Sequence, residues 1–261
     1  MNLFRLAFIF FRVGALNELQ YRVNFFVQLL QSIVGLVVGL VGLALVFDHT
    51  SELNGWNRPQ LLAVMGVHIL MGGLIRAVIQ PNMERLMGDV QEGTLDYALT
   101  KPEDAQVIVS VREFRIWQTM DVLMGLIVIG IAVSQIRAGL GVWQALGFVA
   151  ALLCGALMIY SFWLIITSTA FWVVRVQEIA NLFEGVYAAG RWPVTIYPDW
   201  LRTGLTFIVP VAFAVTVPAE ALTNRLAGQT LLRAAALAVG LLILARWVWR
   251  TGLRRYSGAS A

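Results

Sequence analysis

The sequence predicts an all-α, polytopic membrane protein with six transmembrane helices, and two observations carry that prediction. Hydrophobic residues make up 59% of the chain and charged residues 13%, whereas soluble domains are about 45–50% apolar and about 25% charged. Segments 23–47 and 138–174 contain no charged residue. Because about 20 apolar residues cross a hydrocarbon core as a helix, both segments can span a membrane. The second is too long for one helix and is predicted to contain a loop at 138–143.

Six apolar stretches are predicted to be the spans of a single transmembrane domain that covers residues 1–261. They are 25–47, 60–80, 116–136, 145–172, 203–219 and 230–248. Asp121 lies within the third span and Arg233 within the sixth. Pro210 and Pro218 predict that the fifth span is kinked or short, because proline has no backbone N–H to donate.

Basic residues set the predicted orientation, because cytoplasmic loops of membrane proteins are enriched in lysine and arginine. With both termini inside, fifteen of the 19 Lys and Arg residues fall on the cytoplasmic side and four outside. The longest cytoplasmic connection is then 81–115, between the second and third spans. This topology predicts a multi-pass protein of the plasma (inner) membrane.

Two further segments are predicted to lie at the membrane surface. In residues 1–22, helical spacing puts Phe4, Phe8 and Phe11 on one side and most charges elsewhere, and arginines interrupt the apolar stretch that a signal peptide would need. An interfacial amphipathic helix fits this pattern, and so does a cytosolic helix packed on the protein's own membrane domain. Segment 177–200 is too polar and proline-broken to span, which favours a broken interfacial or re-entrant element.

Several kinds of chemistry are missing from the sequence. The only lysine, Lys101, follows no glycine loop, so the chain has no Walker A motif for ATP. His49, His68 and the lone Cys154 are isolated, which argues against a metal site, and His68 is interpreted as a packed or pore-facing polar residue. No module for nucleic acid is visible. We therefore expect neither catalysis nor a cofactor in this chain.

The sequence "DVQEGTLDYALTKPED", residues 89–104, forms an acidic block in this apolar chain. Gly93 is predicted to stop one helix, and Thr94 to cap a short second helix with Leu95 and Leu99 on one face. The Lys-Pro dipeptide at 101–102 should end that helix, because the residue before proline avoids helical geometry.

A third helix is predicted to begin at Asp104 and to run into span three, with Val107, Val111 and Phe114 as its apolar side. The block as a whole has two interpretations. It is either a solvated loop helix or a docking helix that fits a groove on a cytosolic partner through its apolar residues.

Asp121 is a carboxylate within a predicted span, near the cytoplasmic face. Such residues are costly in a bilayer and often functional. An ion pair with Arg76 or Arg115, which lie near the same interface, would give Asp121 a structural role, and this role is favoured.

Three stretches resemble one known family. They are "EGTLDYALTKPEDAQVIVSVRE" (92–113), "GRWPVTIYPDWLRTGLTFIVPVAFAVTVPAEAL" (190–222) and "GLRRYSGAS" (252–260). In this order they are similar to ABC-2-type transporter permeases, in particular a six-span subfamily once catalogued as a domain of unknown function. The resemblance covers essentially the whole chain.

The resemblance implies a permease subunit that assembles with a second permease and with separate ABC ATPase subunits, which bind ATP and magnesium. It also implies that 1–22 is an interfacial connecting helix and that the acidic block is a coupling helix seated on the ATPase. The expected coupling residues are Glu92, Gly93, Leu95, Asp96, Leu99, Lys101 and Pro102. Leu95 and Leu99 would be the apolar anchors, and the charges would set register and specificity.

The leading hypothesis is thus the permease of an ABC exporter that moves an amphipathic, lipid-like or drug-like molecule. The alternative is an ATPase-independent secondary transporter or channel, which would be expected to show midplane charges and inverted repeats. A scaffold or an intramembrane enzyme is the third possibility, and the chain offers no site for one.

Overall fold

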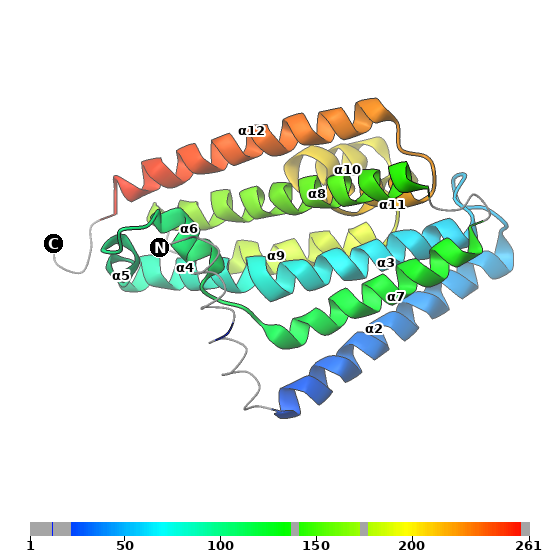
Figure 1. The fold of residues 1–261 in the computed structure, drawn as a ribbon, viewed down its shortest axis with the longest axis horizontal. Helices are drawn as coiled ribbons and strands as arrows, with labels where there is room; N and C mark the ends of the chain where they lie inside the picture. Colours follow the sequence, from blue (N-terminus) through cyan, green and yellow to red (C-terminus); the bar gives the residue numbers. More distant parts are fainter. Residues whose placement is uncertain (1–11, 13–21, 137–140, 173–176, 257–261) are drawn as a thin grey trace.

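The computed structural model describes residue 12 and residues 22–136, 141–172 and 177–256, as an elongated bundle of helices (Figure 1). The predicted interfacial helix 1–22 lies almost entirely outside the described residues. The α-helices are α2 (Arg22–His49), α3 (Arg58–Leu74), α4 (Gln80–Glu92), α5 (Asp96–Leu99), α6 (Ala105–Val111), α7 (Thr119–Gln135), α8 (Val142–Ser168), α9 (Gln177–Ala188), α10 (Asp199–Thr203), α11 (Val217–Leu222) and α12 (Gly228–Leu253).

Short 3-10 or π turns extend or join these helices. They are η1 (Ile75–Ile79), η2 (Ile116–Gln118), η3 (Thr169–Phe171), η4 (Ala189–Arg191), η5 (Val194–Ile196), η6 (Gly204–Ile208) and η7 (Ala212–Thr216). Within the described part of the chain, five helical segments are long and apolar enough to cross a membrane, and a sharply bent pair would make a sixth.

The bundle has two distinct ends (Figure 1). We call the end at which α4 stops and α5 and α6 lie the cap end. The opposite end carries the turn at 50–57 between α2 and α3 and the start of α8, and we call it the turn end. The long helices α2, α3–α4, α7 and α8 alternate in direction between the two ends, as expected for successive membrane crossings.

The second span is much longer than predicted. α3, η1 and α4 form one continuous helical segment of 35 residues, Arg58–Glu92, so the helix predicted to stop at Gly93 continues the second span without a break. The π turn allows this continuation, because the Gln80 N–H donates to the carbonyl of Ile75, five residues earlier, instead of that of Arg76, four residues earlier. Pro81 then stands in the first turn of α4, where its missing N–H costs little.

Close contacts between glycines and neighbouring backbone hold α3 against α7. A Cβ placed on Gly125 would lie 2.5 Å from the backbone nitrogen of Leu70, and one on Gly73 would lie 2.7 Å from the nitrogen of Val122. Both distances are too short for any larger residue, so the two helices approach each other as closely as helices with small residues do in membranes. Among the long apolar segments that the structure describes, the one that contains α3 is the most buried.

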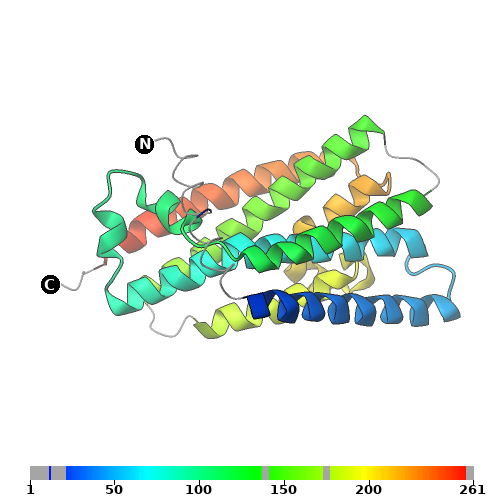
Figure 2. The same cartoon turned by 60° about the horizontal axis from the view of Figure 1, so that its bottom comes forward.

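α2 has a different environment at the edge of the bundle (Figure 2). It packs against α3, α7 and η2, and its other side is exposed and apolar, as at Phe26, Leu30 and Val38. Of its three close-spaced glycines, Gly39 faces Met65 of α3, whereas Gly35 and Gly42 face open space. Of these three glycines, only Gly39 therefore provides a close helix contact within the chain.

Segment 177–200 follows the length of α3 rather than lying across its end. Glu184, Tyr187 and Thr195 contact, in that order, Gln80 at the start of α4, His68 within α3 and Trp56 just before α3. This antiparallel path leads from the π turn towards the turn end of the bundle, which differs from the interfacial or re-entrant element predicted for 177–200. Three hydrogen bonds mark the path: Gln80 Nε2 to Glu184 Oε1 (3.2 Å), Tyr187 Oη to the His68 carbonyl (2.8 Å) and Trp56 Nε1 to Thr195 Oγ1 (3.1 Å).

The predicted fifth span, 203–219, is the bent pair. Helical segments Asp199–Ile208 and Ala212–Leu222 meet at an angle of 80° around Pro210, which confirms the predicted kink. The first segment starts just after Thr195, at the turn end. The second leads to Asn224, whose Oδ1 accepts from Gln144 Nε2 at the start of α8 (3.0 Å), also at the turn end.

The bent pair as a whole thus begins and finishes at the turn end of the bundle. Between them the chain reaches only the middle of α8, where a Cβ on Gly155 would lie 2.6 Å from the carbonyl oxygen of Phe213. We therefore assign the fifth crossing to 177–196 and describe 199–222 as re-entrant. With this assignment, Arg191 and Arg202 no longer fall on the side that the predicted orientation counts as cytoplasmic.

Candidate coupling surface and intramembrane polar cluster

α4 ends at Gly93, as predicted. Gly93 adopts φ 71°, a left-handed conformation that favours glycine, and its N–H donates to the Asp89 carbonyl. That carbonyl also accepts from the N–H groups of Thr94 (2.9 Å) and Leu95 (3.2 Å). Thr94 is not the cap of α5, because its hydroxyl donates to the Asp89 carboxylate (3.2 Å) and Leu95 occupies the cap position.

α5 turns its two predicted anchors in different directions. The side chain of Leu95 is fully buried in the protein's own core, and so is that of Ala98. Leu95 therefore cannot contact a partner, and its assignment as a docking anchor is wrong. The exposed apolar residues of this helix are Tyr97, at 77% exposure, and Leu99, at 38%.

The remaining predicted coupling residues lie around Tyr97 and Leu99 at the cap end. We call the exposed surface of 92–102 the cap surface. Glu92, Lys101 and Pro102 are exposed, and Gly93 and Asp96 are half-buried. Tyr97 was missed in the sequence because only the i, i+4 pair of leucines was considered, although a residue two positions after a buried leucine faces the opposite side of a helix.

α6 begins at Asp104, as predicted, but it does not run into span three. The Asp104 carboxylate accepts from the Gln106 N–H (2.9 Å) and from the Arg246 guanidinium of α12 (2.9 Å). The hydrogen bonds from Arg246 are the main cause that lowers the pKa of Asp104 from its usual value. These contacts attach the start of α6 to the last span.

The buried side of α6 also differs from the prediction. It consists of Gln106, Ile108 and Val109, whereas the three residues predicted as its apolar side are only half-buried. The helix stops at Val111 because the chain turns there to bond with α4: Asn82 Nδ2 donates to the Glu113 carbonyl (2.8 Å), and the Glu113 N–H donates to Asn82 Oδ1 (2.9 Å).

Ion pairs reinforce this connection between α4 and the returning chain. Arg112 lies beside Asp89, and burial is the main cause that lowers the pKa of Arg112, opposed by the charge of Asp89. The cap is thus fastened to the cap end of the 35-residue helical segment on several sides. The ion pairs are Arg85–Glu113, Arg112–Asp89 and Arg115–Glu84.

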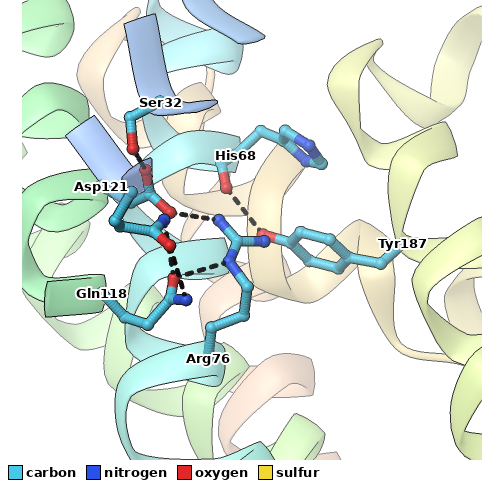
Figure 3. Close-up of polar contacts among 7 residues, drawn as sticks. Ser32, His68, Arg76, Gln118, Asp121 and Tyr187 are labelled. Atoms are coloured by element: carbon cyan, nitrogen blue, oxygen red, sulfur yellow. Dashed lines mark hydrogen bonds and ion pairs between the residues drawn. The ribbon is translucent and has the colours of Figure 1, made fainter. Parts of the chain in front are cut away.

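A polar cluster lies within the bundle where α2, η1 and α7 meet (Figure 3). Arg76 Nη2 lies 2.7 Å from Asp121 Oδ2, and Arg76 Nε donates to Gln118 Oε1 at 3.3 Å. The Ser32 hydroxyl of α2 donates to the other oxygen of Asp121. The predicted pairing of Asp121 with Arg76 is confirmed, while Arg115, the other predicted partner, pairs with Glu84.

His68 lies on α3 beside this cluster and is packed, as one of its two predicted interpretations required. Its ring stacks on Tyr187 of α9 with 4.6 Å between centroids. Its Nδ1 atom is buried and has no hydrogen-bond partner among the described residues. His68 also lines a cavity of about 300 Å³, together with Arg76, Asp121 and Arg191.

Within the described ranges, no group of three or more His, Cys, Asp or Glu side chains is placed to hold a metal ion. The structure instead offers two exposed side chains, Tyr97 and Leu99, on a cap that is held by ion pairs and hydrogen bonds. The cap is joined to the long helical segment Arg58–Glu92, which carries the polar cluster near its middle.

These features define a multi-pass, all-α membrane protein with a braced cap at one end of its bundle. A family model described as ABC-2 family transporter protein matches residues 33–260, and the chain therefore belongs to that family of transporter membrane proteins. No curated protein and no solved structure gave a significant match.

Proposed function

We propose that this chain is the permease subunit of an ABC exporter, which forms the translocation pathway with a second permease and is driven by separate ATPase subunits. Membership of the ABC-2 transporter family supports the proposal. The structural observation that carries it is the cap surface, which presents Tyr97 and Leu99 from a helix that is otherwise buried in the protein's own core.

Tyr97 and Leu99 are suited to be the anchors for the ATPase. A few large apolar or aromatic side chains that enter a groove supply most of the energy of a protein interface, and surrounding charges act mainly on specificity and association rate. Glu92 and Lys101 stand beside these anchors on the cap surface. The cap end is cytoplasmic in this proposal, as the positive-inside rule requires.

Force applied to the cap surface would be passed directly into the membrane domain. Hydrogen bonds and ion pairs between α4 and 112–115 prevent the cap from moving alone. α4 continues through η1 into α3, and 35 residues of helix extend over about 50 Å at about 1.5 Å each. Closure of the ATPase pair would therefore displace the helix that contacts α7, α9 and the re-entrant segment.

Co-purification from native membranes tests this function. A tagged chain should bring down an ABC ATPase, detected by ATP hydrolysis and by peptides that contain a Walker A sequence. The double variant Tyr97→Asp, Leu99→Asp should lose that ATPase, while Trp200→Asp, a matched change of an exposed aromatic residue at the turn end, should retain it. Retention of the ATPase by both variants would contradict the assignment.

A further inference from the structure

The polar cavity beside His68 contains more positive than negative charge. Its ionised side chains are Arg76, Asp121 and Arg191, and Arg76 is already paired with Asp121. Arg191 forms no ion pair with any residue that the structure describes. The exposed guanidinium of Arg191 therefore lines the cavity without a counter-charge, and an uncompensated charge is costly at membrane depth.

His68 adds a second unsatisfied group at the same place. Gly190, the neighbour of Arg191, lies against His68: a Cβ on Gly190 would be 3.5 Å from the His68 Nδ1 atom. That nitrogen is buried and lacks a partner within the described chain. A buried polar atom without a hydrogen bond is rare in native structures and calls for a missing partner. The unpaired guanidinium of Arg191 and the imidazole ring of His68, which both line the cavity, together point to an anion.

A larger, apolar cavity adjoins the polar one. It measures about 740 Å³ and lies under the turn-end half of α2, and the side chain of Leu36 lines both cavities. Volumes of about 300–1,000 Å³ are typical of sites for small organic ligands. Its apolar lining includes Leu36, Leu40, Leu43, Leu62, Val128 and Ile131.

We propose that the two cavities form one binding site for an amphipathic anion. Its charged head, a phosphate or carboxylate group, binds beside Arg191 and His68, and its apolar chain lies under α2 beyond Leu36. The ligand enters from the bilayer past α2, the helix whose outer side is exposed and apolar. This inference names the class of molecule that the proposed exporter moves, so it rests on the proposed function.

Direct binding to the permease–ATPase complex in phosphatidylcholine nanodiscs tests the charge requirement. The probe is radiolabelled dodecyl phosphate, and the competitors are inorganic phosphate and the cation dodecyltrimethylammonium. Dodecyl phosphate should bind saturably, and neither competitor should displace it at equal concentration. Arg191→Gln should weaken binding about tenfold, which corresponds to about 1.4 kcal/mol. Arg233→Gln removes an exposed arginine of α12 in the same way and should leave binding unchanged.

A second pair of variants tests the place of the site independently of charge. Gly35 lines the polar cavity, and a Cβ there meets no atom within 4 Å, so the side chain introduced by Gly35→Leu takes up space in the cavity. Gly42 of the same helix also faces open space but does not line either of the two cavities. Gly35→Leu should weaken binding of dodecyl phosphate at least about tenfold, and Gly42→Leu should not.

Three results would overturn the proposed site. The first is equal binding of dodecyl phosphate by Arg191→Gln and Arg233→Gln, and the second is equal binding by Gly35→Leu and Gly42→Leu. The third is competition by the cation dodecyltrimethylammonium that equals competition by unlabelled dodecyl phosphate. The binding assay on the permease alone separates this failure from failure of the proposed function. A chain that binds the anion but never associates with an ATPase would retain the site and lose the exporter role.

Discussion

Arg76 and Asp121 form an ion pair with 2.7 Å between Nη2 and Oδ2, and this pair joins the π turn of the second span to the first turn of α7. The Asp121 side chain is almost fully buried, whereas Arg76 remains 38% exposed at its cavity side. Ser32 of α2 donates to the same carboxylate. A single carboxylate thus holds three spans together at the level where the long helix departs from α-helical geometry.

The first prediction concerns this ion pair. Asp121→Asn should lower the melting temperature of the detergent-solubilised protein, because it leaves Arg76 without its counter-charge. Arg76→Gln should do so too, and the double variant should lose less than the sum of the two. A coupling energy of about 0.5–3 kcal/mol is typical of residues in direct contact. Strictly additive effects in the double-mutant cycle would show that the pair contributes no coupling to stability.

The second prediction concerns the end of α4. Gly93→Ala should destabilise the protein by about 1–2 kcal/mol, because alanine is strained in the left-handed conformation that Gly93 adopts. Gly88→Ala is the matched control: Gly88 lies inside the same helix with open space at its Cβ position, and alanine favours a helix. The control should be neutral or stabilising. Thermal unfolding of both variants, followed by loss of helical circular dichroism, measures the difference.

The third prediction concerns the pH dependence of the cap. Hydrogen bonds from Arg246 hold the pKa of Asp104 below its ordinary value, so the ionised carboxylate stabilises the folded state. That stabilisation is fully present above the unfolded-state pKa, about 3.9, and is lost as the pH falls through the lower folded-state pKa. Asp104→Asn keeps a capping side chain but loses the charge.

Wild type should therefore melt at a higher temperature than Asp104→Asn at pH 7, and the gap should shrink on acidification below about pH 4. Because 42% of the Asp104 side chain is exposed to solvent, the effect should be modest. Melting temperatures measured at both pH values decide the matter, and a gap that stays constant or widens at low pH contradicts the assigned role of Asp104.

The fourth prediction concerns the topology of the re-entrant segment. Single cysteines at Asp199 and Asn224, introduced after replacement of Cys154 by serine, should react with an impermeant maleimide from the same side of the membrane as a cysteine at Glu52. A cysteine at Tyr97 should react from the opposite side. Labelling of positions 199 and 224 from opposite sides would restore 203–219 as a complete span.

Much of the fold follows from local patterns in the sequence. Long uncharged runs determine α2 and α8, and the capping chemistry of Gly93 and Asp104 fixes where α4 stops and α6 starts. The pairing of Asp121 with Arg76 also follows, because a buried carboxylate needs a nearby cation. These features depend on residues that are close in sequence or on strong physical requirements.

The features that were wrong depend on tertiary contacts. The continuity of the second span with the helix that stops at Gly93 was not predicted, because a π turn that accommodates Pro81 leaves no simple sequence signal. Segment 177–200 was predicted to be too polar to cross, since its path alongside α3 is visible only in three dimensions. Leu95 was assigned to a partner because an apolar residue on a short helix serves equally well in the protein's own core.

The central claim is that the cap surface docks on an ATPase, and site-specific photo-crosslinking at Tyr97 tests it most directly. Benzoylphenylalanine replaces Tyr97 in one protein and Trp200, the exposed aromatic residue at the turn end, in a control. After irradiation of native membranes, position 97 should form an adduct that contains ATPase peptides, and position 200 should not. An ATPase adduct at position 200, with none at position 97, would contradict the account.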